Sequence, residues 1–274
     1  MYPILEKKVL SENVKQLKIK APLVAKKAQP GQFIILRIDE KGERIPLTIA
    51  DFDRKEGTIT IIFLEVGKTT KQLGTLKVGD SVENFVGPLG VPSEVKKYGT
   101  VVCIGGGVGI APLYPIVKAL REAGNHVISI LGAKTEKLLI LEKEIQAYSN
   151  EFYIATDDGS KGQKGFVSDV LKQVIDKKGN INMVMAIGPI IMMKVVSDVT
   201  RKYNIKTLVS LNPIMVDGTG MCGGCRVSVD GKTKFACVDG PEFDGLKVDY
   251  ENLMLRNRRF THEEGDACRL ADIR

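Results

Sequence analysis

The pattern of hydrophobic positions changes near residue 98. Before that point, short apolar or alternating segments such as GQFIILRID and EGTITIIFLEV are separated by turn residues, including Pro30-Gly31, Gly57 and the run from Gly87 to Gly90. Alternation with a period of two predicts β-strands, and short strands at close spacing are typical of a small antiparallel barrel. We therefore expect residues 1–97 to form a β barrel.

From residue 98 to residue 211, apolar runs alternate with segments of helical period. TVVCIGGG, HVISILGAK, EFYIATDDGS, NMVMAIG and KTLVSL have the pattern of strands, and segments such as IAPLYPIVKALREAG have the pattern of helices. Strands that alternate with helices of this length predict parallel βαβ units in a doubly wound sheet, which binds ligands outside the carboxyl ends of its strands. The expected fold class is a β barrel followed by this α/β sheet.

The alternation stops after Leu211. Residues 212–245 contain seven glycines, and residues 246–274 form a polar tail that carries Arg256, Arg258 and Arg259. A segment with so many glycines has too little apolar area to fold alone, so we expect an inorganic group to stabilise it.

Composition narrows the class of protein further. The chain has 274 residues, 43% hydrophobic and 27% charged, which are ordinary globular values and exclude overall disorder. No apolar run approaches the roughly 18 residues of a membrane span, and the N-terminus lacks the apolar core of a signal peptide, so we expect a cytoplasmic protein without a membrane partner. The net charge of +7 suits an anionic partner, but 6% aromatic residues and no Trp offer little stacking surface for nucleic acid.

Three of the five cysteines lie within sixteen residues. Cys222 and Cys225 form a C-x2-C pair and Cys237 follows, whereas Cys103 sits in the apolar run TVVCIGG, where we expect an inert buried thiol. An odd number of cysteines without a secretory signal argues against a disulfide framework. Thiolates are soft ligands, so the trio predicts an iron–sulfur cluster, with a structural zinc site as the alternative.

The fourth ligand is open on spacing alone. The plant-type [2Fe–2S] pattern places a cysteine five positions before the C-x2-C pair, and here Asp217 stands at that position. A carboxylate can bind iron, but Asp217 is also suited to a turn ahead of Gly218. Cys268 in the tail is the competing ligand.

A second motif follows the first strand of the α/β region. The run from Gly105 to Pro112 combines a glycine-rich turn with the start of a helix, where backbone N–H groups and the helix dipole favour a pyrophosphate. The acidic residue expected some 20 positions later for the ribose is not evident, and Lys134 lies near that strand end instead. The choice between NAD and NADP stays open.

A third motif lies in the predicted barrel. Pro46-Leu47-Thr48 ends in a hydroxyl that can reach a flavin ring, and Gly67-Lys68-Thr69-Thr70 can bind a phosphate with N–H and hydroxyl groups.

Together these motifs resemble the ferredoxin reductase-like flavoproteins, and within them the small subunits of NADH-dependent ferredoxin:NADP oxidoreductases. The segments ERIPLTIAD, GGGVGIAP, ATDDGS, GPIIMM and MVDGTGMCGGCRVSVDGKTKFACVDGPEFDG carry the resemblance. The related electron-transfer subunits of dihydroorotate dehydrogenase use a fourth cysteine where this chain has Asp217. The resemblance implies an FAD-binding barrel (1–97), an NAD(P)-binding α/β domain (98–211), a [2Fe–2S] cluster loop (212–245) and a C-terminal tail (246–274).

The resemblance also implies roles for particular residues. The flavin would contact Pro46, Leu47, Thr48, Ile62 and Phe63, and its pyrophosphate would contact Thr69 and Thr70. The nicotinamide nucleotide would contact Gly105, Gly106, Gly107, Gly109, Ile110, Ala111, Pro112, Thr156, Asp157, Asp158, Gly188, Pro189 and Met192. The cluster ligands would be Asp217, Cys222, Cys225 and Cys237. Ile45 stands where the general family pattern has Arg, and Leu47 stands where it has an aromatic residue.

The function implied by the resemblance is electron transfer between NAD(H), FAD and a [2Fe–2S] cluster, with NADP(H) as a possible nucleotide. A larger partner subunit would hold a second flavin and [4Fe–4S] clusters, and ferredoxin would exchange electrons with the complex by electron bifurcation. No catalytic acid or base is expected. The alternatives are the electron-transfer subunit of a dihydroorotate dehydrogenase and a zinc-stabilised nucleotide-binding regulator without turnover.

Overall fold

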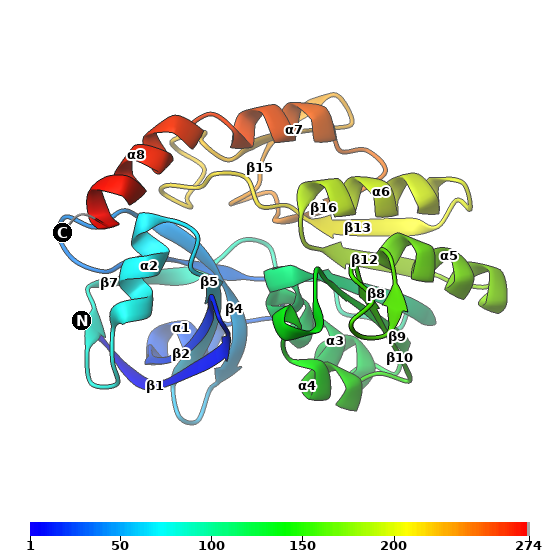
Figure 1. Cartoon of the computed structure of the whole chain (residues 1–274), viewed down its shortest axis with the longest axis horizontal. Helices are drawn as coiled ribbons and strands as arrows, with labels where there is room; N and C mark the ends of the chain where they lie inside the picture. Colours follow the sequence, from blue (N-terminus) through cyan, green and yellow to red (C-terminus); the bar gives the residue numbers. More distant parts are fainter. Residues whose placement is uncertain (273–274) are drawn as a thin grey trace.

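The computed structural model describes residues 1–272 and contains two seven-stranded sheets and a small hairpin. Figure 1 shows the N-terminal barrel in blue and cyan beside the α/β region in green, with the C-terminal segment in yellow to red lying across both. The fold class predicted from the hydrophobic pattern is confirmed, whereas the bounds of the four predicted segments stay predictions.

The first sheet is antiparallel throughout and runs in the order β6-β1-β2-β5-β4-β3-β7. Its strands are β1 (Tyr2–Ser11), β2 (Val14–Lys20), β3 (Phe33–Arg37), β4 (Ile45–Asp53), β5 (Thr58–Leu64), β6 (Ser81–Val82) and β7 (Asn84–Leu89). Two short helices accompany it, α1 (Pro22–Lys27) and α2 (Lys68–Thr75). The sheet encloses a core of Ile, Leu and Phe side chains, which include Leu17, Ile34 and Phe63.

The second sheet has the order β11-β10-β9-β8-β12-β13-β16, and only its last pair is antiparallel. Its strands are β8 (Thr100–Gly106), β9 (His126–Ala133), β10 (Glu151–Thr156), β11 (Gln163–Lys164), β12 (Met183–Ile187), β13 (Lys206–Ser210) and β16 (Glu242–Asp244). The helices that cover it are α3 (Ile110–Glu122), α4 (Glu142–Ala147), α5 (Val167–Lys178) and α6 (Ile190–Arg201), with single 3-10 turns at Gly107–Gly109 and Glu136–Leu138.

Strand β8 explains why the α/β region begins with an unbroken apolar run. Val101 and Cys103 face one core, which contains α3, while Val102 and Ile104 face the other core, which contains α5 and α6. A parallel strand covered on both faces needs apolar residues at every position. Cys103 is fully buried, as expected, and burial raises the pKa of its thiol to about 12.

The C-terminal segment has more regular structure than its glycine content predicts. It contains the hairpin β14 (Arg226–Val229) and β15 (Lys232–Phe235), and two helices, α7 (Tyr250–Asn257) and α8 (Thr261–Asp272). Strand β16, which the sequence pattern left inside a loop, completes the second sheet beside β13. Helix α8 reaches back to α2 of the barrel (Figure 1).

A cluster of ionisable groups closes the amino end of the second sheet. The carboxylate of Glu151 on β10 lies 2.7 Å from Nζ of Lys178 and 2.9 Å from Nε2 of His126, and it accepts a hydrogen bond from the hydroxyl of Tyr153 at 3.1 Å. The bond from Lys178 and, to a lesser extent, those from His126 and Tyr153 lower the pKa of Glu151 from 4.5 to about 2, against a smaller opposing effect of burial.

We expect Glu151→Gln to destabilise the fold at pH 7 by about 1 kcal/mol, because the partners of Glu151 are partly solvated. A lowered pKa in the folded state stabilises the protein above the ordinary value of 4.5, and this contribution is lost as the pH falls towards 2. Thermal unfolding from pH 7 to pH 2 should show the gap between wild type and variant closing below pH 4.5. A gap that stays constant over this range contradicts the account, and Glu136→Gln, at a more exposed pair with Lys161, serves as the control.

Candidate functional site

Strand β4 presents the residues expected to line a flavin. Pro46, Leu47 and Thr48 are half-buried and pair with Ile35, Ile34 and Phe33 of β3. On β5 the situation differs, since Ile62 packs with residues of α3 and Phe63 packs inside the barrel. Phe63 is 2% exposed, so only its backbone is available to a ligand. Leu47 packs partly against the same barrel core as Phe63, so the three half-buried residues of β4 present only part of their surface to a ligand.

The start of helix α2 has the features of an anion site. Thr70 accepts hydrogen bonds through Oγ1 from the backbone N–H groups of Val66 and Gly67, at 3.1 and 3.0 Å, which fixes the turn. A side chain at Gly67 would meet nothing within 4 Å, so the space before the helix is open. Backbone N–H groups at a helix start, next to open space, suit a phosphate.

The glycine-rich turn brings the carboxyl ends of β8 and β12 together. A Cβ at Gly106 would lie 2.4 Å from Sδ of Met192, and a Cβ at Gly188 would lie 2.7 Å from Cε of the same residue. Gly107 has φ +56 and open space above it. Met192 therefore contacts both Gly106, at the end of β8, and Gly188, directly after β12. Ile110 and Ala111 are buried in the core, which leaves their backbone at the start of α3 for a ligand.

The end of β10 contributes hydroxyl and carboxylate groups to the same edge of the sheet. Thr156 is buried, and its Oγ1 donates to the carbonyl of Lys161 at 2.8 Å. Asp157 and Asp158 are exposed in the turn that follows. The carboxylate of Asp158 accepts hydrogen bonds from Oγ and N of Ser160, at 2.7 and 2.9 Å, and these bonds lower its pKa.

The predicted cluster ligands form two neighbouring pairs. The β14–β15 hairpin brings Sγ of Cys225 to 3.2 Å from Sγ of Cys237, and burial is the main cause that raises the pKa of Cys237 to about 12. The carboxylate of Asp217 accepts hydrogen bonds from the N–H groups of Thr219, at 3.0 Å, and Cys222, at 2.9 Å, and these lower its pKa. Between residues 1 and 272, no group of three or more His, Cys, Asp or Glu side chains is assembled to hold a metal ion.

The chemistry of these residues fits an iron–sulfur cluster. The donors are soft thiols and one carboxylate, and the N–H of Gly224 already donates to Sγ of Cys222 at 3.4 Å. Positive φ angles at Gly218, Gly220 and Gly223 let the loop turn tightly around the cysteines. Cys268, the competing ligand, lies instead in α8, the helix that packs against α2.

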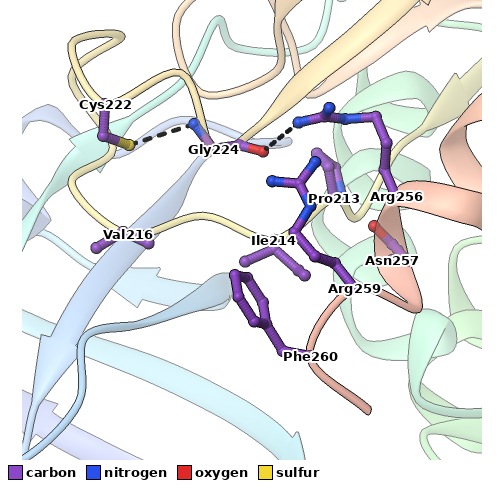
Figure 2. Close-up of a pocket in the computed structure, with 9 residues that line it drawn as sticks. All are labelled: Pro213, Ile214, Val216, Cys222, Gly224, Arg256, Asn257, Arg259 and Phe260. Carbon is purple, nitrogen blue, oxygen red and sulfur yellow. Dashed lines mark hydrogen bonds between the residues drawn. The ribbon is translucent and has the colours of Figure 1, made fainter. Parts of the chain in front are cut away.

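One arginine from outside the motif, Arg256, is bonded to the loop. Arg256 on α7 donates from Nη2 to the carbonyl of Gly224 at 3.2 Å and from Nε to the carbonyl of Arg226 at 3.1 Å. Figure 2 shows the guanidinium of Arg256 directed at the carbonyl of Gly224. Both residues line a cavity of about 170 Å³ together with Ile214, Cys222 and Phe260. The arginines of the tail are evident in the sequence, but this contact is not, because 32 residues separate Arg256 from Gly224.

The loop also touches β3, the strand paired with β4, and β7, the strand on the other side of β3. A Cβ at Gly218 would lie 2.7 Å from Cδ1 of Leu89 on β7 and 2.9 Å from Cγ1 of Ile35 on β3. Ile35 is the register partner of Pro46. The predicted cluster loop therefore packs directly against the strand pair that presents the predicted flavin site.

Comparison with protein-family models divides the chain into three parts. Residues 1–92 match an oxidoreductase FAD-binding domain, residues 103–198 match an oxidoreductase NAD-binding domain, and residues 212–249 match the iron–sulfur cluster binding domain of dihydroorotate dehydrogenase B. None of the helices within residues 1–272 is both long and apolar enough to span a bilayer.

Three similar proteins cover nearly the whole chain. An uncharacterised protein encoded in the adh 3' region of Clostridium beijerinckii is 52% identical over 97% of this chain and 93% of its own length. A homologue of the electron transfer subunit of dihydroorotate dehydrogenase B (NAD(+)) from Thermotoga maritima is 49% identical over 95% and 92%. A chain in a structure of NADH-dependent reduced ferredoxin-NADP oxidoreductase, studied for flavin-based electron bifurcation, is 46% identical and superposes with a TM-score of 0.95 over 100% of this chain and 98% of that one.

We expect Arg256→Met to loosen the loop without unfolding the protein. The substitution removes two charge-assisted hydrogen bonds to backbone carbonyls, each worth about 1.5–3 kcal/mol. Amide hydrogen exchange of the peptide spanning residues 216–226 should become roughly tenfold faster or more. Arg258→Met, at an exposed position on the same helix end, is the matched control and should leave that exchange unchanged. Equal exchange in the two variants would show that Arg256 does not hold the loop.

Proposed function

The chain belongs to the family of dihydroorotate dehydrogenase B electron transfer subunits and their homologues, and from this premise we propose that it is the NAD(H)-linked subunit of a ferredoxin:NADP oxidoreductase complex. It is an oxidoreductase subunit with FAD-binding, NAD-binding and iron–sulfur-binding domains. The contact of Gly218 with Ile35 and Leu89 is the observation that carries the proposal, because it joins the cluster loop to the flavin strands.

The bound groups supply the redox chemistry: the nicotinamide gives a hydride, the flavin divides the electron pair and the cluster carries single electrons. The protein positions them. We assign the flavin ring to Pro46, Leu47 and Thr48 on β4. The start of α2 would hold the pyrophosphate of FAD. The turn from Gly105 to Gly109 and the end of β10 hold the nucleotide at the carboxyl edge of the second sheet, as expected for this fold.

No side chain has to exchange a proton with the substrate for hydride transfer. His126, one of the two histidines in the sequence, lies at the amino end of the sheet and is paired with Glu151, remote from the carboxyl edge. The role that we assign to the protein residues is to orient the rings.

We assign Asp217, Cys222, Cys225 and Cys237 as the ligands of a [2Fe–2S] cluster. Asp217 is favoured over Cys268 because its carboxylate is hydrogen-bonded to the backbone of Cys222, whereas Cys268 belongs to a helix packed on the barrel. A carboxylate as the fourth ligand also favours the ferredoxin:NADP oxidoreductase over dihydroorotate dehydrogenase. The electron-transfer subunits of dihydroorotate dehydrogenase resemble this chain but have a cysteine at the position of Asp217.

The homologues are subunits of larger complexes, so the protein has a heteromeric partner. We assign this partner as a larger subunit with a second flavin and [4Fe–4S] clusters, through which ferredoxin and NADP(H) exchange electrons. The alternative partner is a dihydroorotate-oxidising subunit. The zinc-stabilised regulator has no support, because the cysteine-bearing segment matches an iron–sulfur model and the rest of the chain matches oxidoreductase domains.

Anaerobic purification gives a direct test. The protein should show flavin absorption bands together with broad iron–sulfur absorption, and NADH should bleach the flavin bands. Co-purification with a larger subunit and reduction by NADPH or ferredoxin identifies the complex, whereas reduction by dihydroorotate supports the alternative. A colourless protein that contains zinc would contradict both.

The ligand assignment is tested by two substitutions. Asp217→Ala should lower the iron content and the iron–sulfur absorption of the purified protein to less than about half, because one of four ligands is lost. Cys268→Ala should leave both unchanged. The reverse result, an intact cluster in Asp217→Ala and a lost cluster in Cys268→Ala, would show that the assignment is wrong.

A further inference from the structure

The loop between β3 and β4 is fastened to helix α2 at two points. Nε2 of Gln72 donates to the carboxylate of Asp39 at 2.9 Å, and Oγ1 of Thr69 donates to the carboxylate of Glu43 in a short hydrogen bond. Asp39 and Glu43 stand at the two ends of a turn around Gly42. The loop thus lies along the helix, with Glu43 at the helix start and Asp39 one turn further on.

The contact of Glu43 places a negative charge where the helix attracts one. Helix α2 has no acidic residue in its own first turn, and Thr70 already uses its hydroxyl to fix the turn at Gly67. Thr69 is 5% exposed, so its hydroxyl is a buried donor that needs an acceptor. The carboxylate of Glu43 supplies the acceptor and gains from the positive end of the helix dipole.

The same helix start is the one assigned to the pyrophosphate of FAD. Two anions cannot share it without cost, since like charges within a few ångströms repel strongly at a partly buried site. The general family pattern has an arginine at position 45, where this chain has Ile45, and the cations nearest in sequence are Arg44 beside Glu43 and Lys68 at the first position of α2. The loop that carries Glu43 ends where β4 begins at Ile45, so its release need not displace the strand residues assigned to the ring.

We propose that Glu43 is an internal competitor of the flavin pyrophosphate, and that FAD binds only when the β3–β4 loop releases the hydroxyl of Thr69. The inference rests on the proposed FAD site. No bond is made or broken: the hydroxyl hydrogen of Thr69 turns from the carboxylate to a phosphate oxygen, and Glu43 moves into solvent. The loop is then an autoinhibitory contact that weakens FAD binding.

Equilibrium binding to the flavin-free protein tests the proposal. Glu43→Gln keeps the length and the acceptor oxygen of the side chain but removes its charge, and should tighten FAD binding about tenfold. Glu43→Ala should do the same. Asp39→Asn is the matched control, because Asp39 lies in the same loop but contacts α2 through Gln72, away from the helix start, and its FAD affinity should stay within about twofold of wild type. Quenching of flavin fluorescence measures each dissociation constant.

Riboflavin separates the pyrophosphate effect from a general change of the loop. It has the ring but no phosphate, so its affinity should be equal in wild type and in all three variants. A gain for riboflavin as large as that for FAD, or unchanged or weaker FAD binding in Glu43→Gln, overturns the role of Glu43 and leaves the proposed function standing. Failure of wild type and Glu43→Gln alike to bind FAD instead contradicts the proposed function itself.

Discussion

The close approach of Gly218 to the barrel is the constraint on which the site depends. Any larger side chain would meet Leu89 and Ile35 below van der Waals distance, and the positive φ of Gly218 requires glycine independently. This contact sets how far the cluster loop lies from the flavin strand. Electron transfer between two bound groups needs a short, fixed separation, and the packing of Gly218 keeps the predicted cluster loop close to the barrel.

A shared hydrophobic core holds that approach in place. Cys225 and Cys237 pack in the same cluster of buried residues as Phe33 and Ile35 of the barrel and Phe243 of β16. The glycine-rich segment therefore does not form a separate hydrophobic core. Its buried residues pack together with residues of the barrel and of the second sheet. Strand β16 adds to this by tying the segment into the second sheet, and Arg256 closes the loop from the opposite side.

The sequence predicted the parts of this arrangement that depend on local spacing. The glycine turn after β8, the C-x2-C pair and the alternation of strands and helices are all features of neighbouring residues. The contacts of Gly218 with Ile35 and of Arg256 with Gly224 join segments that are distant in the sequence. The periodicity of hydrophobic residues cannot predict such contacts. The burial of Phe63 could not be predicted from the sequence either. The family resemblance implies that Phe63 lines the flavin ring, but its side chain packs in the barrel core. The helices of the tail were missed since their apolar faces are short and broken by charged residues.

The most direct test of the account follows electrons through the protein in time. Anaerobic, flavin- and cluster-loaded protein is mixed with NADH, the flavin absorption is recorded by stopped flow, and the cluster is followed by electron paramagnetic resonance after rapid freezing. The account predicts that the flavin bands bleach first and that the signal of a reduced [2Fe–2S] cluster rises afterwards. A cluster that is reduced before the flavin, or that stays oxidised while the flavin is repeatedly reduced and reoxidised, would contradict it.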